Sequence, residues 1–168
     1  MNKLFLIFIL SLILNSCNQK VELEKYDKNG NLIVYSEQVY SEMWLKNKNL
    51  KVTVIDTFCI NQKKRAIDDI KKGKLIHFTT EALTFNKISR LLNKYGIQTQ
   101  KNYSRCARMS GFDPNCYENE MENEIEKRFG KKFIDSLSEI ALKEFVTENP
   151  DKPWTRDGVD LRKKYNIK

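Results

Sequence analysis

Residues 75–103 read LIHFTTEALTFNKISRLLNKYGIQTQKNY, and this stretch predicts a strand, a helix and a second strand in succession. Residues 75–80 form a short, mostly apolar run with the length of a buried strand. Apolar residues then recur at helical spacing from Leu83 to Tyr95, and Gly96 follows, which predicts an amphipathic helix that ends at the glycine. The segment IQTQKNY after Gly96 predicts a further strand.

The segments before residue 75 predict strands with little helix. Residues 21–26 alternate in polarity, residues 27–30 (DKNG) favour a tight turn, and residues 31–40 return as a second strand. Residues 50–60 (LKVTVIDTFCI) are rich in β-branched residues and predict the clearest strand of the chain. Residues 62–74 predict a short charged helix that Gly73 stops.

The segments after residue 110 predict helices. Asp113 and Pro114 are typical of a helix start, and an apolar residue follows at every fourth position from Tyr117 to Phe129. The five glutamates between residues 118 and 126 are interpreted as the solvated face of this helix. Residues 131–146 predict a second helix, and the apolar residues of the tail 151–168 indicate that it docks on the domain.

A chain of 168 residues has room for one domain, which we place at residues 21–168. We expect an α+β fold, with a small, mainly antiparallel sheet in the N-terminal half that is covered by helices, and two consecutive helices near the C-terminus. A βαβαβ arrangement over residues 50–103 is the alternative. No glycine-rich phosphate loop follows any of its strands, and we expect no cofactor.

The N-terminal residues predict where in the cell the protein is located. Residues 4–14 are apolar except for Ser11, and as a helix they would span only about 17 Å, too short for a bilayer but suitable for a signal peptide. Leu14-Asn15-Ser16-Cys17 follows, and this segment resembles the lipobox of bacterial lipoproteins.

The resemblance implies a signal peptide of residues 1–16, cleavage before Cys17 and lipid on that cysteine, with residues 17–20 as a tether. Several acyl chains would anchor the protein firmly in the lipid bilayer. In lipoproteins of this kind an aspartate after the cysteine often marks inner-membrane retention. Here the residue is Asn18, which favours the outer membrane facing the periplasm in a cell with two membranes.

The net charge of the chain and its low arginine content indicate which classes of partner it can bind. Lys and Arg number 30 against 22 Asp and Glu, which gives a net charge of +8 at pH 7, and only 7 of the basic residues are arginine. A basic protein is attracted to anionic lipids, polymers and nucleic acid, but specific phosphate recognition prefers arginine. We therefore expect no nucleic acid as a partner, and either a protein or an anionic envelope polymer.

The cysteines other than Cys17 predict one disulfide. Cys106 and Cys116 flank a loop that contains Gly111 and Pro114, and in an oxidising compartment we expect these two to pair. Cys59 would then be a buried free thiol, although a bond from Cys59 to either of the other two remains open. The spacing of the three thiols and His77 matches no usual zinc pattern, and no metal site is expected.

No catalytic signature is visible, and the leading hypothesis is a non-enzymatic binding module, of which an immunity-type protein against an incoming toxin is one form. The alternative is an envelope hydrolase that uses His77 with Asp56 or Cys59. A third class is a scaffold in an envelope assembly. The candidate residues for binding a partner or an anion are on the expected disulfide loop and in the tail: Arg105, Arg108, Phe112 and Trp154.

Overall fold

The computed structural model describes residues 23–102 and 108–167. These residues form six helices and six short strands, in the order β1 (Leu32–Val34), α2 (Glu37–Lys46), β2 (Val52–Val54), α3 (Thr57–Lys71), β3 (Leu75–Thr79), α4 (Phe85–Asn93), β4 (Ile97–Lys101), α5 (Cys116–Phe129), α6 (Phe133–Glu148), β5 (Thr155–Arg156), β6 (Val159–Asp160) and α7 (Leu161–Lys164). No helix within the described ranges is long and apolar enough to cross a membrane.

The chain divides into two compact units, and the smaller one contains described residues 23–33 and 51–53. Its centre is the tight turn predicted at residues 27–30. The Asp27 carboxylate accepts hydrogen bonds from the backbone N–H groups of Asn29 and Asn31, at 2.8 Å each, and from the Thr53 hydroxyl at 2.5 Å. These bonds, with the Thr53 bond the largest cause, lower the pKa of Asp27 to about 2. The turn therefore binds the chain before β1 to β2.

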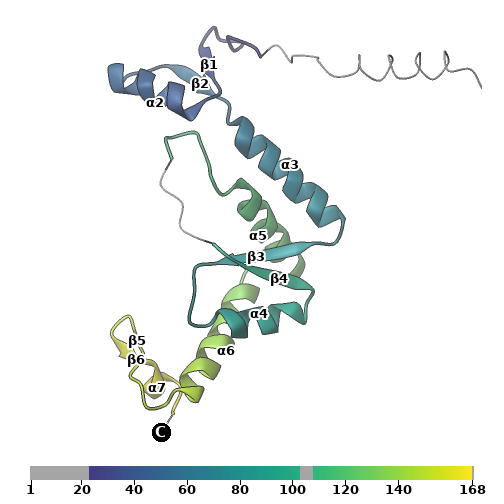
Figure 1. Cartoon of the computed structure of the whole chain (residues 1–168), viewed down its shortest axis with the longest axis vertical. Coiled ribbons are helices and arrows are strands. Elements are labelled where there is room, and N and C mark those ends of the chain that lie inside the picture. The colour runs from purple at the N-terminus through teal and green to yellow at the C-terminus, as the bar shows by residue number, and fades with distance from the viewer. Residues whose placement is uncertain (1–22, 103–107, 168) are drawn as a thin grey trace, which may run out of the picture. The chain divides into compact units, whose positions relative to one another are not determined.

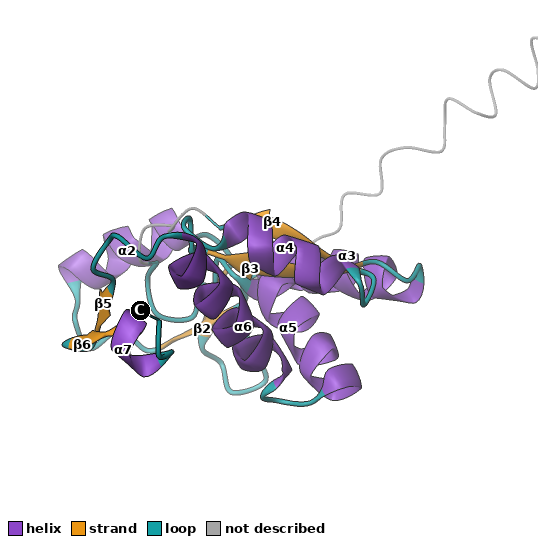
Figure 2. Ribbon diagram, turned by 90° about the horizontal axis from the view of Figure 1, so that it is seen from below, coloured by secondary structure: helices purple, strands orange, loops and turns teal. Residues whose placement is uncertain are grey.

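The larger unit, residues 34–50 and 54–168, is built around the parallel pair β3–β4. Leu75 lies opposite Ile97 and Thr79 opposite Lys101, with α4 as the crossover between the two strands. Figure 1 shows β3 and β4 in the middle of this unit, with α3 and α5 toward one end and α4 and α6 toward the other. Figure 2 shows α4 along the strand pair and a short connection from α5 to α6.

Two apolar clusters hold these elements together. The larger cluster joins β3, α4, β4, α5 and α6 through buried side chains, namely Leu75, Ile88, Leu91, Leu92, Ile97, Ile125, Leu137 and Ala141. The smaller one joins α3, β3 and α5 through Ala66, Ile76, Tyr117 and Met121. The strand pair thus contributes buried residues to both clusters: Leu75 to the larger and its neighbour Ile76 to the smaller, as expected for side chains that alternate along a strand.

The prediction of a small, mainly antiparallel sheet in the N-terminal half is wrong. The sheets of the described residues are pairs of strands, and the pair β3–β4 is parallel. The reason is the connection: β3 and β4 are joined by a helix, and a helical crossover brings the second strand back in the same direction. The α+β composition and the two consecutive helices α5 and α6 are present.

Two segments predicted as long strands contain only a three-residue strand each, and each continues into a helix. In residues 31–40 only β1 is a strand, and α2 begins at Glu37. In residues 50–60 the strand ends at Val54, because Asp56 accepts a hydrogen bond from the Cys59 backbone N–H at 3.0 Å and so caps the start of α3. The capping aspartate outweighs the β-propensity of the residues that follow it.

Predictions that rested on helical periodicity are confirmed. In α4 the buried residues are Ile88, Leu91 and Leu92, and the helix ends shortly before Gly96. Gly130 separates α5 from α6 with a φ of 95°, a conformation that favours glycine. Helix α5 begins at Cys116, slightly later than the Asp113–Pro114 signal predicts.

The tail is docked, as predicted. Strands β5 and β6 form an antiparallel hairpin whose turn residues Asp157 and Gly158 have positive φ. The rings of Trp154 and Phe145 on α6 meet edge to face at 4.9 Å, and the Glu139 carboxylate on α6 accepts hydrogen bonds from Lys164 and Tyr165. The C-terminal segment therefore packs on α6.

Candidate functional site

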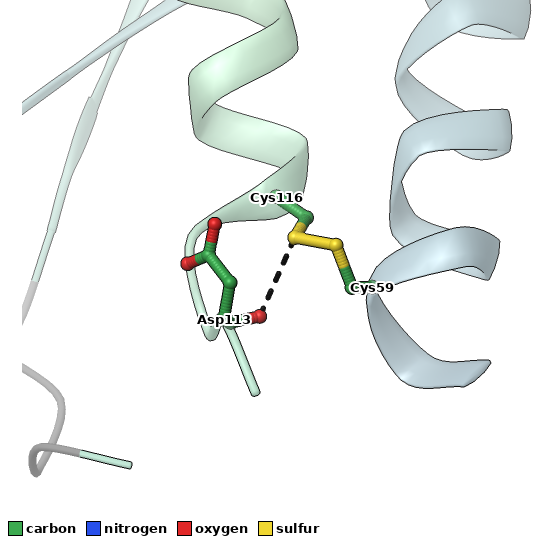
Figure 3. A group of neighbouring side chains, drawn as sticks. All are labelled: Cys59, Asp113 and Cys116. Atoms are coloured by element: carbon green, nitrogen blue, oxygen red, sulfur yellow. Dashed lines mark hydrogen bonds between the residues drawn. A yellow bond between two sulfur atoms is a disulfide. The ribbon is translucent and has the colours of Figure 1, made fainter. Parts of the chain in front are cut away.

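A disulfide joins the N-terminal ends of α3 and α5. Cys59 in the first turn of α3 is bonded to Cys116, the first residue of α5, with a Cα–Cα distance of 5.3 Å across a sequence separation of 57 residues. Figure 3 shows this bond, with the backbone carbonyl oxygen of Asp113 at 3.5 Å from the Cys116 sulfur. The bond holds together two helices that are distant in the sequence.

This pairing differs from the expected Cys106–Cys116 bond. A sulfur takes part in one disulfide, so the Cys59–Cys116 bond and the expected bond exclude each other; Cys106 lies outside the described residues. The expectation rested on the short distance in sequence between Cys106 and Cys116. The pairing in the structure is the alternative that the sequence left open, and it arises because Cys59 lies on a helix that packs against α5.

Arg108 lies between two carboxylates of the large unit. Its Nε is 2.6 Å from Glu37 Oε2, and its Nη1 is 3.6 Å from Asp56 Oδ2. Glu37 also accepts the Met109 backbone N–H at 2.7 Å, and Asp56 accepts the Asp113 backbone N–H at 2.9 Å. The bond from Met109, followed by that from Arg108, lowers the pKa of Glu37. These contacts neutralise Arg108 and fix residues 108–113 as a supporting loop.

Gly111 brings this loop close to the end of β2. Its φ is 92°, and a Cβ atom at this position would lie 3.1 Å from the side chain of Val54. Both the backbone conformation and the close approach require glycine here.

The described residues proposed for partner binding, Arg108, Phe112 and Trp154, are held in packing and ion-pair contacts. Phe112 is buried at 6% exposure and meets the Tyr40 ring edge to face at 5.9 Å, so it is a packing residue. Trp154 packs on Phe145, and its indole nitrogen is buried without a hydrogen-bond partner among the described residues. Arg105 lies outside the described residues.

The residues of the hydrolase alternative do not form a hydrogen-bonded group around His77. His77 on β3 is 8% exposed, and its Nδ1 lies 3.3 Å from Oε2 of Glu122 on α5. Neither Asp56 nor Cys59 hydrogen bonds with His77. The Cys59 sulfur is in the disulfide and carries no thiolate for nucleophilic attack. The charged and polar contacts of these residues are therefore structural.

The Cys59 and Cys116 sulfurs and the Asp113 carboxylate lie within 4.8 Å of one another. Metals bind cysteine as the thiolate. With both sulfurs joined in the disulfide, this group offers a metal only the carboxylate, and we assign no metal to it.

Beside the disulfide is a cavity of about 150 Å³, which we call the α3–α5 cavity. Helices α3 and α5 and strands β3 and β4 supply its walls, with aromatic, amide and charged side chains: Phe58, Gln62, Arg65, Phe78, Gln100, Pro114, Tyr117 and Glu118. Two of these residues are sequence neighbours of the bonded cysteines, Phe58 of Cys59 and Tyr117 of Cys116, so the disulfide limits the distance between the α3 and α5 walls of the cavity.

Tyr117 in the wall of the α3–α5 cavity is held by three contacts. Its hydroxyl donates a hydrogen bond to Asp69 Oδ2 at 2.7 Å, its ring meets Phe78 edge to face at 5.9 Å, and the Arg65 guanidinium lies 4.3 Å from its ring centre. Burial, followed by the bond to the Asp69 carboxylate, raises the pKa of Tyr117 to about 12. The ring is therefore neutral at physiological pH and held from three sides.

Three polar side chains of the α3–α5 cavity have unused hydrogen-bonding capacity. Within residues 23–102 and 108–167, the amides of Gln62 and Gln100 form no side-chain hydrogen bond. Among the same residues no carboxylate lies within ion-pair distance of Arg65, whose contact is the Tyr117 ring. The cavity can therefore offer several donors and acceptors to a ligand.

The α3–α5 cavity was not predictable from the sequence because its lining residues come from four separate segments. The one available signal was Asp56 as a helix cap. Starting a helix there puts Phe58, Gln62 and Arg65 at spacings of four and three, on one helix face.

Comparisons of the chain with protein-family models, with curated proteins and with solved structures found no match.

Proposed function

We propose that this protein is a cell-envelope lipoprotein whose folded part is a non-enzymatic binding module. The observation that supports this cellular location is the segment Leu14-Asn15-Ser16-Cys17 at the end of the apolar run that begins at residue 4. Lipid on Cys17 tethers the protein to a bilayer, and Asn18 after the cysteine favours the outer membrane facing the periplasm. A disulfide between Cys59 and Cys116 is consistent with an oxidising compartment.

What supports binding over catalysis is the distribution of the chemically active groups. His77 bonds with Glu122, Asp56 caps α3 and supports the loop at Arg108, and Cys59 is in a disulfide. The α3–α5 cavity, by contrast, has polar groups with unused hydrogen-bonding capacity, which is typical of a recognition site. A binding role therefore fits the polar groups of the α3–α5 cavity better than a catalytic role fits His77, Asp56 and Cys59.

Metabolic labelling with an alkyne analogue of palmitate tests the tether. The wild-type chain, expressed in a bacterium with two membranes, should incorporate the label, and Cys17→Ala should not. Cys106→Ala is the matched control, because it removes a cysteine outside the motif and should keep the label. Equal labelling of the wild type and Cys17→Ala would refute the lipoprotein proposal.

Crosslinking in intact cells tests the binding role. A tagged full chain should capture a protein or an envelope polymer, and substitution of the cavity residue Gln62 by alanine should reduce that capture. Turnover of a panel of ester, amide and glycoside substrates by the purified chain, abolished by His77→Gln, would contradict the non-enzymatic assignment.

A further inference from the structure

We propose that the α3–α5 cavity binds a single neutral sugar ring, as presented by a glycan of the cell envelope. This inference rests on the proposed function, since it names the ligand of the envelope binding module. It is carried by four features of the cavity: its size, its aromatic walls, its unpaired polar groups and the balance of its charges.

The size of the cavity suits one six-membered ring. Its volume is about 150 Å³. An apolar cavity of about this volume binds benzene, so a ring of six atoms fits such a space. A chain of several sugars does not fit inside it, and the remainder of a glycan would extend from the cavity into solvent.

The aromatic walls provide surfaces for the C–H faces of a sugar. Phe58 is 43% exposed, and two further aromatic residues of the lining, Phe78 and Tyr117, meet edge to face. An exposed aromatic side chain in a lining with the partly buried Phe78 and the buried Tyr117 is a surface on which an apolar ring face gains contact area. The C–H groups of a pyranose form such a face.

The polar groups match hydroxyl groups, each of which both donates and accepts. Arg65 offers N–H donors, and the amides of Gln62 and Gln100 offer donors and acceptors. The two amides form no side-chain hydrogen bond with described residues, so a ligand would satisfy them without breaking a bond of the fold.

The charges of the lining favour a neutral ligand over an acid. Arg65 is a cation, but Glu118 is an anion in the same lining, and its Oε2 accepts a hydrogen bond from the Asn102 amide at 2.8 Å. A carboxylate ligand would gain from Arg65 and lose from Glu118. A neutral polyol carries no charge for Glu118 to repel, and its hydroxyl groups can accept from Arg65.

The cavity is also prearranged for a ligand. The Cys59–Cys116 bond holds the ends of α3 and α5 together, and the Tyr117–Asp69 hydrogen bond fixes one wall. A site that is already ordered spends less binding free energy on ordering its side chains. We therefore expect a single sugar ring to bind tightly enough for its binding to be measured.

The test is saturation-transfer NMR on the full chain, solubilised from membranes in detergent, with glucose and N-acetylglucosamine as neutral probes and glucuronate as the matched acid. We expect transfer to at least one neutral sugar, with a dissociation constant on the order of 1 mM. Glucuronate should bind more weakly. Gln62→Ala and Gln100→Ala should each weaken binding about five-fold, because each removes a hydrogen bond to the ligand.

Lys64→Ala and Gln98→Ala are the controls. They lie on α3 and β4, outside the cavity lining, and should bind as the wild type does. Circular dichroism of each variant verifies that it is folded. Preferential binding of glucuronate, absence of transfer to both neutral sugars, or equal binding by the lining and control variants would overturn the proposal.

The outcome is separable from that of the proposed function. Cys17→Ala should bind the sugar as the wild type does, because the tether is not part of the cavity. Loss of sugar binding with intact palmitate labelling would refute only the sugar ligand, and loss of labelling with intact sugar binding would refute only the tether.

Discussion

The Glu37 carboxylate and the Arg108 guanidinium form an ion pair across 71 residues of sequence, with Nε and Oε2 2.6 Å apart. The same carboxylate accepts a hydrogen bond from the Met109 backbone N–H. One side chain of α2 therefore pairs with the charge of Arg108 and also holds the backbone of the loop. The loop in turn leads to Asp113 and to the start of α5. The contact is therefore part of what positions the disulfide.

Glu37→Gln should lower the thermal midpoint at neutral pH, because it removes the charge that Arg108 and the Met109 N–H stabilise. The pKa of Glu37 is lowered in the fold, so its contribution is fully present above the ordinary carboxyl pKa of about 4.3 and is lost as pH falls through the folded-state pKa. Thermal unfolding of the wild type and the variant should therefore converge in acid. Glu42→Gln, also on α2 but exposed, should change little; equal effects of the two substitutions would contradict the assignment.

Tyr117 gives a prediction at alkaline pH. Its pKa is raised to about 12, against an ordinary value of about 10, so the stability it contributes is complete below pH 10 and is lost as pH rises toward 12. Ultraviolet titration should show a tyrosine step near pH 12 that Tyr117→Phe removes, while Tyr165, whose pKa is also raised by burial, is unaffected by the substitution. In Asp69→Asn, which removes the carboxylate that accepts its hydroxyl, this tyrosine should titrate earlier. An unchanged titration step near pH 12 in Tyr117→Phe would refute the assignment.

Leu92 tests the larger apolar cluster. It is fully buried in α4, and Leu92→Ala should destabilise the fold by about 2–5 kcal/mol because it leaves a cavity. Leu83→Ala is the matched control, since Leu83 is 57% exposed and its removal should cost little. Urea unfolding measures both, and a similar loss in each would contradict the packing described here.

The disulfide can be mapped directly. Mass spectrometry of peptides under non-reducing conditions should find Cys59 joined to Cys116, and a peptide that joins Cys106 to Cys116 would refute the pairing. Cys59→Ser and Cys116→Ser should each lower the free energy of unfolding, by about 4 kcal/mol in the chain-entropy model for a loop of this length. Cys106→Ser should leave that disulfide intact.

Local features of the fold were predictable from the sequence. The burial of Ile88, Leu91 and Leu92 follows from their spacing. Gly96 and Gly130 follow the ends of α4 and α5, as expected for a glycine after a helical pattern. These features depend on residues within a few positions of one another. The docking of the tail followed from its apolar residues, Trp154 among them.

Features that depend on distant residues were not predictable. Glu122 belongs to a row of glutamates that indicated a solvated face, yet it bonds with His77 on β3 because α5 packs against that strand. Gln62 and Gln100 are ordinary polar residues until α3 and β4 place them in one cavity. Asp56 is the exception, because its capping role is local and was hidden by the β-branched residues around it.

The bond between Cys59 and Cys116 closes a covalent ring that contains β3, α4 and β4. A protease that cuts the chain once between these two cysteines opens the backbone but releases no fragment. The two pieces should separate in gel electrophoresis only after reduction. The parallel strand pair would thus remain attached to both bonded helices after a nick, whereas the same cut would divide a chain without this bond.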